Sequence, residues 1–114
     1  MINKRLNRMN PRKGTVIDCF CKISVDCLEL NVEATYLLGK SVDRVDVLID
    51  NSKDEIYIIP NNENGEYKLH KKKNSNNSSV CLAGLLSQEK NIRTDKRYEI
   101  ISCERGIMFS FERE

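Results

Sequence analysis

The apolar and polar positions of this chain alternate in short runs, a pattern that predicts a mostly β protein. Two β-branched runs, "VDRVDVLID" (42–50) and "EIYIIP" (55–60), flank the turn-rich link "NSKD". Together they predict a β-hairpin. The segment 19–30 alternates over part of its length and then changes phase, which predicts a single bulged or bent strand.

Two segments show helical spacing instead. In "VEATYLLG", Ala34, Leu37 and Leu38 fall at i, i+3 and i+4, and Gly39 follows as a C-terminal stop. The same one-face spacing recurs in the second half of the chain at Leu82, Leu85 and Leu86. The sequence therefore predicts two short helices.

The remaining segments complete the predicted element order. "EYKLHKKK" (66–73) reads as an edge strand, because lysine is common on exposed edges, and "NSNNSS" (74–79) reads as a polar loop. "RYEIIS" (97–102) and "GIMFSF" (106–111) are two further strands joined by a turn. A helix face, a charged strand, a turn and an apolar strand thus occur twice, about 52 residues apart. This order predicts a duplicated unit, although any two apolar hairpins share some of the resemblance.

The predicted organisation has four parts. Residues 1–17 form a basic arm, 18–60 a first β-helix-β-β unit, 61–79 an edge strand and polar loop, and 80–114 a second helix-β-β unit. At 114 residues, the part from 18 to 114 is expected to share one core as a single compact domain. The fold class is α+β, mostly β with two short helices.

Residues 28–60 resemble the AbrB-type swapped-hairpin family, the small DNA-binding domains of transition-state regulators and many antitoxins. The resemblance rests on motif positions at the family's spacing: Leu30, Glu33, Leu38, Gly39, Val45, Val47, Ile49 and the strand 56–60. It implies a small barrel in which two β-helix-β-β units interleave their strands. The two units would then pair within one chain, as in tandem members of the family, or between the chains of a homodimer.

The chain departs from that family's motif at its functional surface. Asn31 stands where the motif has proline, and Thr35 stands where it has the arginine that faces DNA. Val32, Tyr36 and Leu37 occupy positions that are usually charged in the family. The resemblance therefore implies a degenerate member. These three side chains form a candidate protein interface, the alternative being that they pack on the second unit.

Charge is unevenly distributed along the chain. Five of the 19 basic residues and none of the 17 acidic residues lie in 1–17. Such a cluster can neutralise phosphates and gives salt-dependent affinity for nucleic acid, although a solubilising tail would look the same. The candidate nucleic-acid contacts are the arm residues Lys4, Arg5, Arg8, Arg12 and Lys13 together with Lys71, Lys72 and Lys73, the last three being alternatively the guard of an edge strand.

The candidate chemistry is limited. Five cysteines are an odd number and no secretion signal is visible, so we expect reduced thiols in a cytoplasmic protein. Cys19 and Cys21 lack the CxxC spacing that zinc sites prefer, and His70 is the single histidine. Without a catalytic motif we expect neither an enzyme nor a cofactor or metal site.

Three functions are consistent with these features. The first is a non-enzymatic regulator that binds nucleic acid, most simply duplex DNA, through its basic arm. The second is a protein-binding inhibitor from a phage or other mobile element that acts on a host nucleic-acid-binding protein, such as a CRISPR effector or another defence nuclease. The third is a small assembly protein. The composition alone does not separate them.

Overall fold

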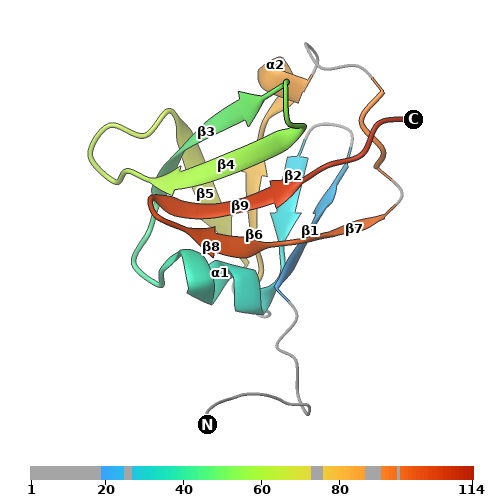
Figure 1. Cartoon of the computed structure of the whole chain (residues 1–114). Helices are drawn as coiled ribbons and strands as arrows, with labels where there is room; N and C mark the ends of the chain where they lie inside the picture. The colour runs from blue at the N-terminus through green and yellow to red at the C-terminus, as the bar shows by residue number, and fades with distance from the viewer. Residues whose placement is uncertain (1–18, 25–26, 73–75, 87–90, 95) are drawn as a thin grey trace, which may run out of the picture.

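The computed structural model describes residues 19–24, 27–72, 76–86, 91–94 and 96–114, so the basic arm lies outside the described residues. The described chain is mostly β, in a nearly closed antiparallel barrel (Figure 1). Its elements are β1 (Phe20–Ile23), β2 (Cys27–Leu30), α1 (Val32–Leu38), β3 (Arg44–Asp50), β4 (Glu55–Pro60), β5 (Tyr67–Lys71), β6 (Ser78–Cys81), α2 (Ala83–Leu86), β7 (Arg97–Glu99), β8 (Ile101–Cys103) and β9 (Gly106–Ser110). Among these residues, no helix has the length and apolar character needed to cross a membrane.

One continuous segment nearly closes the barrel. The strand order is β7-β1-β2-β6-β5-β3-β4-β9-β8, and the two strands at its ends are separated in sequence only by Ile100. β7 pairs with β1, whereas β8 pairs with β9. The segment 97–103 therefore bridges both edges of the sheet, so that neither edge presents a long row of unpaired backbone groups.

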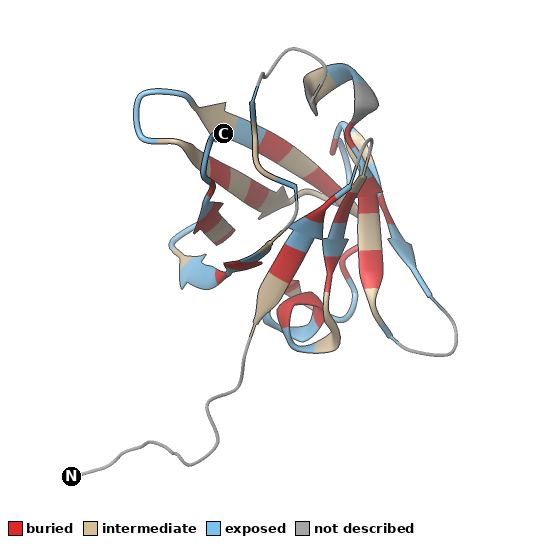
Figure 2. Ribbon diagram, turned by 90° about the vertical axis from the view of Figure 1, so that its right-hand side faces the viewer, coloured by how far each residue is buried: buried red, intermediate tan, exposed pale blue. Residues whose placement is uncertain are grey.

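The core fills the inside of this barrel. Successive side chains of a strand point to opposite faces, and Figure 2 shows the resulting alternation of buried and exposed positions along the strands. The largest fully buried side chains come from both halves of the chain: Leu28, Leu30, Val45, Ile56, Ile58, Val80, Leu82, Ile107 and Phe109. Neither half thus hides its apolar face alone, and burial of each such side chain stabilises the fold by about 1.5–3 kcal/mol.

Helix α1 lies where the sequence predicts the first helix. Asn31 caps its N-terminus by accepting a hydrogen bond from the Ala34 backbone N–H at 2.9 Å. Gly39 ends it with φ of 135°, a backbone conformation that residues with a side chain rarely adopt. The buried positions are Ala34, Thr35 and Leu38, so the predicted apolar face is correct except at Leu37, which is exposed.

Four element predictions need correction. The segment 19–30 is a hairpin of two strands, β1 and β2, instead of one bent strand. β5 is not an edge, because it pairs with β3 on one side and β6 on the other. Its exposed Lys68 and His70 face outward from the barrel wall instead. The end of the predicted polar loop, from Ser78, belongs to β6. The second predicted helix is reduced to the four-residue helix α2, which is shorter than α1.

The order of elements occurs twice. A hairpin (β1–β2), α1, β3 and β4 are followed by a hairpin (β5–β6), α2, the segment β7–β8 and β9. Corresponding strands meet, because β2 pairs with β6 and β4 pairs with β9, both antiparallel. Matching positions also have matching partners, since Arg44 lies opposite Lys68 and Arg97 opposite Lys22. The two halves are therefore joined at four places in the barrel wall, where β1 pairs with β7, β2 with β6, β3 with β5 and β4 with β9.

Candidate nucleic-acid interface

The α1 end of the barrel is organised by Asn31. Besides capping α1, its side-chain oxygen accepts a hydrogen bond from the Phe20 backbone N–H at 3.2 Å, and its amide donates to Glu33 at 3.1 Å. Asn31 thus ties the start of β1 to the helix. The start of β1 therefore lies beside α1.

A cationic hollow of about 290 Å³ lies at the same end, lined by Thr35, Tyr36, Lys40, Lys71 and Asn76. The Lys71 ammonium donates to the backbone carbonyl of Lys40, and the Lys40 ammonium lies 5.4 Å from the centre of the Tyr36 ring. Two elements far apart in the sequence thus contribute one lysine each. Among the described residues, no carboxylate lines this hollow, which makes it suited to an anionic group.

One nearby carboxylate partly offsets the positive charge of the hollow. Lys71 also lies 4.0 Å from the Asp43 carboxylate, which is largely exposed to solvent. Such an exposed ion pair contributes little and is screened by salt. Lys72, the next residue in the chain, is exposed. Of the predicted contacts, Lys71 therefore lines the hollow and Lys72 follows it in the chain, whereas Lys73 and the five cations of the arm lie outside the described residues.

Thr35, at the position where the sequence resemblance would predict a DNA-facing arginine, is buried. It is 3% exposed, and its hydroxyl lies 2.7 Å from that of buried Ser78. Its hydroxyl also donates to the Asn31 carbonyl at 2.8 Å. A long cationic side chain at this position would need a different orientation of the helix. Sequence reasoning missed this pair, because its members lie 43 residues apart.

The predicted protein interface is only partly exposed. Tyr36 is 48% and Leu37 is 42% exposed, whereas Val32 is half-buried. The alternative, in which all three pack on the second unit, is therefore wrong for Tyr36 and Leu37. Because Tyr36 also lines the cationic hollow, the interface residues and the lysines share one surface.

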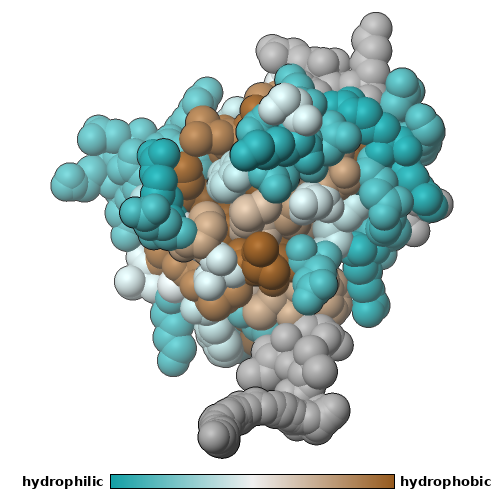
Figure 3. Space-filling view, viewed as in Figure 1, coloured by the Kyte–Doolittle hydropathy of each residue, from teal (hydrophilic) through white to brown (hydrophobic). Residues whose placement is uncertain are grey.

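A second surface lies on the outer face of β3, β4, β9 and β8. Register places Leu48 opposite Tyr57, Tyr57 opposite Met108, and Met108 opposite Ile101. Leu48 is 49% and Ile101 is 52% exposed. Apolar side chains gather in the middle of this face (Figure 3). We call these four residues the apolar row; sequence reasoning missed it because it depends on cross-strand register.

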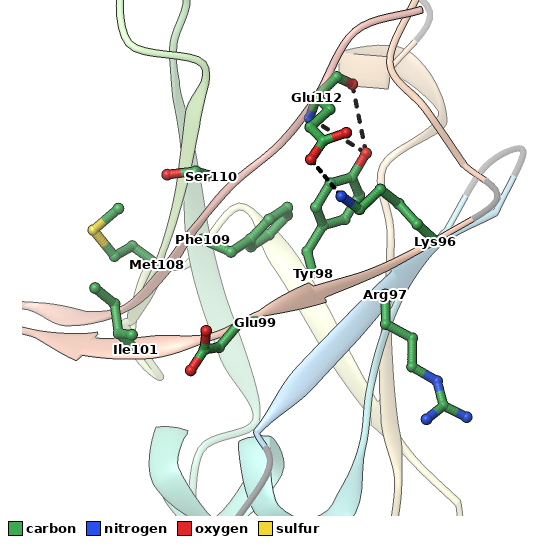
Figure 4. Close-up of a pocket in the computed structure, with 9 residues that line it drawn as sticks. All are labelled: Lys96, Arg97, Tyr98, Glu99, Ile101, Met108, Phe109, Ser110 and Glu112. Atoms are coloured by element: carbon green, nitrogen blue, oxygen red, sulfur yellow. Dashed lines mark hydrogen bonds and ion pairs between the residues drawn. The ribbon is translucent and has the colours of Figure 1, made fainter.

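Two hollows flank the apolar row. One, of about 390 Å³, is shown in Figure 4 and is lined on one side by Ile101, Met108 and Phe109. Three of its polar side chains are already paired: Lys96 forms an ion pair with Glu112, as Figure 4 shows, and the Tyr98 hydroxyl donates to the Arg93 carbonyl. Burial raises the pKa of Tyr98 above its usual value. The other hollow, of about 380 Å³, includes Leu48, Tyr57 and Cys103.

The cysteines and acidic residues assemble no metal cluster in the described part of the chain, where no group of three or more His, Cys, Asp or Glu side chains converges. None of the five cysteines, all of them within the described residues, forms a disulfide. Only Cys21 is buried, and burial raises the pKa of its thiol far above the usual value, which leaves it unreactive. His70 is exposed on β5.

Comparison with known proteins provides no relative: no protein-family model, no curated protein and no solved structure matches this chain.

Proposed function

We propose that the protein is a non-enzymatic nucleic-acid-binding regulator that grips the phosphate backbone with the α1 end of its barrel. The observation that carries this proposal is the hollow in which Lys40 and Lys71 converge, with no carboxylate among the lining residues that the structure describes. The five cations of residues 1–17 precede β1 in the sequence, and the start of β1 at Phe20 lies next to the same helix. Both features favour an anionic polymer over a small neutral ligand.

The AbrB-type scaffold is part of this proposal. We infer that the barrel is a duplicated swapped-hairpin unit, with one copy from β1 to β4 and the other from β5 to β9. The support is the repeated element order and the antiparallel pairing of β2 with β6 and of β4 with β9. In this arrangement the two copies pair within one chain, and the second copy begins at β5 instead of at residue 80.

The mode of binding would differ from that of the family. Because Thr35 is buried, the family's arginine has no counterpart that could reach a base edge. Contacts from lysines to phosphates fix position without reading sequence. The protein is therefore expected to bind duplex DNA with affinity that depends strongly on salt and weakly on base sequence.

The test is a titration of random-sequence duplex DNA, followed by fluorescence anisotropy, at salt concentrations between about 50 and 200 mM. Each phosphate contact adds about 0.9 to the slope of log affinity against log salt. Lys40→Ala/Lys71→Ala should lower that slope by about 1–2, and removal of residues 1–13 should lower it further. Circular dichroism of each variant checks that the barrel remains folded.

Lys22→Ala/Lys53→Ala is the matched control, because it removes the same charge from the outer face of β1 and from the β3–β4 turn. It should change the slope less than the variant in the hollow. Equal slopes for the two double variants would contradict a contact site at the hollow. Absence of DNA binding by the full chain at the lowest salt would contradict the proposal itself.

The apolar row favours a second function, inhibition of a host defence nuclease by protein–protein contact. Exposed apolar side chains that gather on one face are typical of protein interaction sites. The test is the activity of purified defence nucleases, CRISPR effectors included, with and without the protein. Inhibition that is lost in Leu48→Asp/Ile101→Asp and kept in Lys40→Ala/Lys71→Ala would favour this function over the first.

A further inference from the structure

Cys27 and Cys81 lie directly opposite each other on β2 and β6. The register of these antiparallel strands pairs Cys27 with Cys81, one step beyond the pair Leu28 and Val80. Leu28 and Val80 are fully buried, so strand alternation turns both cysteines to the outer face of the barrel. Cys27 is half-buried and Cys81 is exposed.

This geometry suits a disulfide. Directly opposite residues of an antiparallel pair have Cα atoms about 4.5 or 5.5 Å apart, depending on their hydrogen-bonding position. Both values lie within the range of about 4.4–6.8 Å that disulfides span. The two sulfurs therefore need side-chain rotation more than backbone movement. The neighbouring strands β2 and β6 are shown in Figure 1.

The other three cysteines have no such neighbour in the described pairings. Cys21 lies opposite Leu30 and Tyr98, and Cys103 lies opposite Gly106. The carbonyl of Cys19 accepts a hydrogen bond from the Ile100 backbone N–H. The register therefore selects one cysteine pair among the five.

We propose that Cys27 and Cys81 are a redox-responsive pair that a small-molecule disulfide, of the oxidised glutathione class, converts to an intramolecular disulfide. The exposed Cys81 thiolate attacks one sulfur of the reagent, whose S–S bond breaks to release one thiolate and leave a mixed disulfide on Cys81. The Cys27 thiolate then attacks the Cys81 sulfur and displaces the second small thiolate. The two thiol protons of the protein end on the two released thiols, so the protein loses two electrons and two protons.

The disulfide would link the two halves of the chain covalently at the β2–β6 pair, one of the four strand pairs that join them. It closes a long loop, which restricts the unfolded chain more than a short loop does. Cross-strand disulfides that are exposed to solvent are also accessible to reduction. Oxidation would therefore raise resistance to unfolding reversibly.

The experiment treats the full chain with glutathione buffers of increasing oxidised fraction, alkylates the remaining thiols and maps tryptic peptides by mass. The expected product links peptide 23–40 to peptide 74–90, which contain Cys27 and Cys81 respectively. The linked protein should melt at a temperature higher by roughly 10 °C. Dithiothreitol should return both the peptide map and the melting temperature to those of the reduced protein.

Three variants distinguish oxidation of the Cys27–Cys81 pair from unspecific oxidation of other thiols. Cys81→Ser should form neither the linked peptides nor the stabilised species, and Cys27→Ser provides the same test should Cys81→Ser fold poorly. Cys103→Ser is the matched control and should behave as the original chain. Linkage through any other cysteine, a mixed disulfide that persists on Cys81, or linkage of the two peptides without a rise in melting temperature would overturn the proposal.

Discussion

The buried hydroxyl pair of Thr35 and Ser78 provides the sharpest test of how α1 is held on the barrel. Thr35 has two oxygen neighbours, the Asn31 carbonyl at 2.8 Å and the Ser78 hydroxyl at 2.7 Å. A carbonyl only accepts, so the Thr35 hydroxyl donates to Asn31 and accepts from Ser78. Ser78 therefore loses its acceptor when the Thr35 hydroxyl is removed, whereas Thr35 keeps the Asn31 carbonyl as its acceptor when the Ser78 hydroxyl is removed.

The perturbation is a set of three variants: Thr35→Val, Ser78→Ala and the double variant. In Thr35→Val, the Ser78 hydroxyl loses its acceptor while 1% exposed, and an unsatisfied buried donor costs about 1–3 kcal/mol. In Ser78→Ala, Thr35 still donates to Asn31, so we expect a cost of about 1 kcal/mol. The double variant leaves no unsatisfied donor, and we expect it to be no less stable than Thr35→Val alone.

The assay is urea unfolding followed by far-ultraviolet circular dichroism, which suits a chain without tryptophan. With a slope of about 1–3 kcal/mol per molar urea, a loss of about 2 kcal/mol lowers the midpoint by about 1 M. A coupling energy near zero, with the double variant losing the sum of the two single losses, would refute the directional pairing. Equal losses in the two single variants would refute the unequal dependence.

Three further predictions follow from the packing and charge of the barrel. Leu28→Ala, at a fully buried position, should lower the free energy of unfolding by about 2–5 kcal/mol in the same urea assay; a loss below 1 kcal/mol, as at a surface site, would contradict the core assignment. Gly65→Ala should destabilise the fold, because a Cβ would lie 2.5 Å from the Asn61 backbone oxygen, whereas Gly84→Ala, with open space around its Cβ, should not; equal thermal melting temperatures would contradict this. The pKa of Asp46 is lowered, first by the Asn61 side-chain hydrogen bond. Its contribution to stability is thus full above about pH 4, the unfolded pKa, and lost as the pH falls through the lower folded pKa. Asp46→Asn should therefore destabilise at pH 7 and converge with the original chain in acid, and a constant difference at all pH values would exclude this linkage.

The candidate site was only partly predictable. The sequence pattern identifies Lys71 and Lys72 as candidate contacts, but it assigns them to an edge strand with no relation to α1. The hollow exists because β5 is an inner strand whose end reaches the helix, so that Lys71 meets Lys40. Tyr36 belongs to a different predicted surface, and only the fold brings it to the same hollow.

Local pattern by itself determined several parts of this protein. The alternation of 42–60 specifies the β3–β4 hairpin, and Asn31 and Gly39 set the limits of α1, because each depends on residues only a few positions apart. The tertiary structure alone decided the closure by 97–103, the burial of Thr35 against Ser78, and the pairing of Cys27 with Cys81. Those contacts join segments about 40–80 residues apart, and the choice of partner strand and register is settled only when both halves bury their apolar faces in one core.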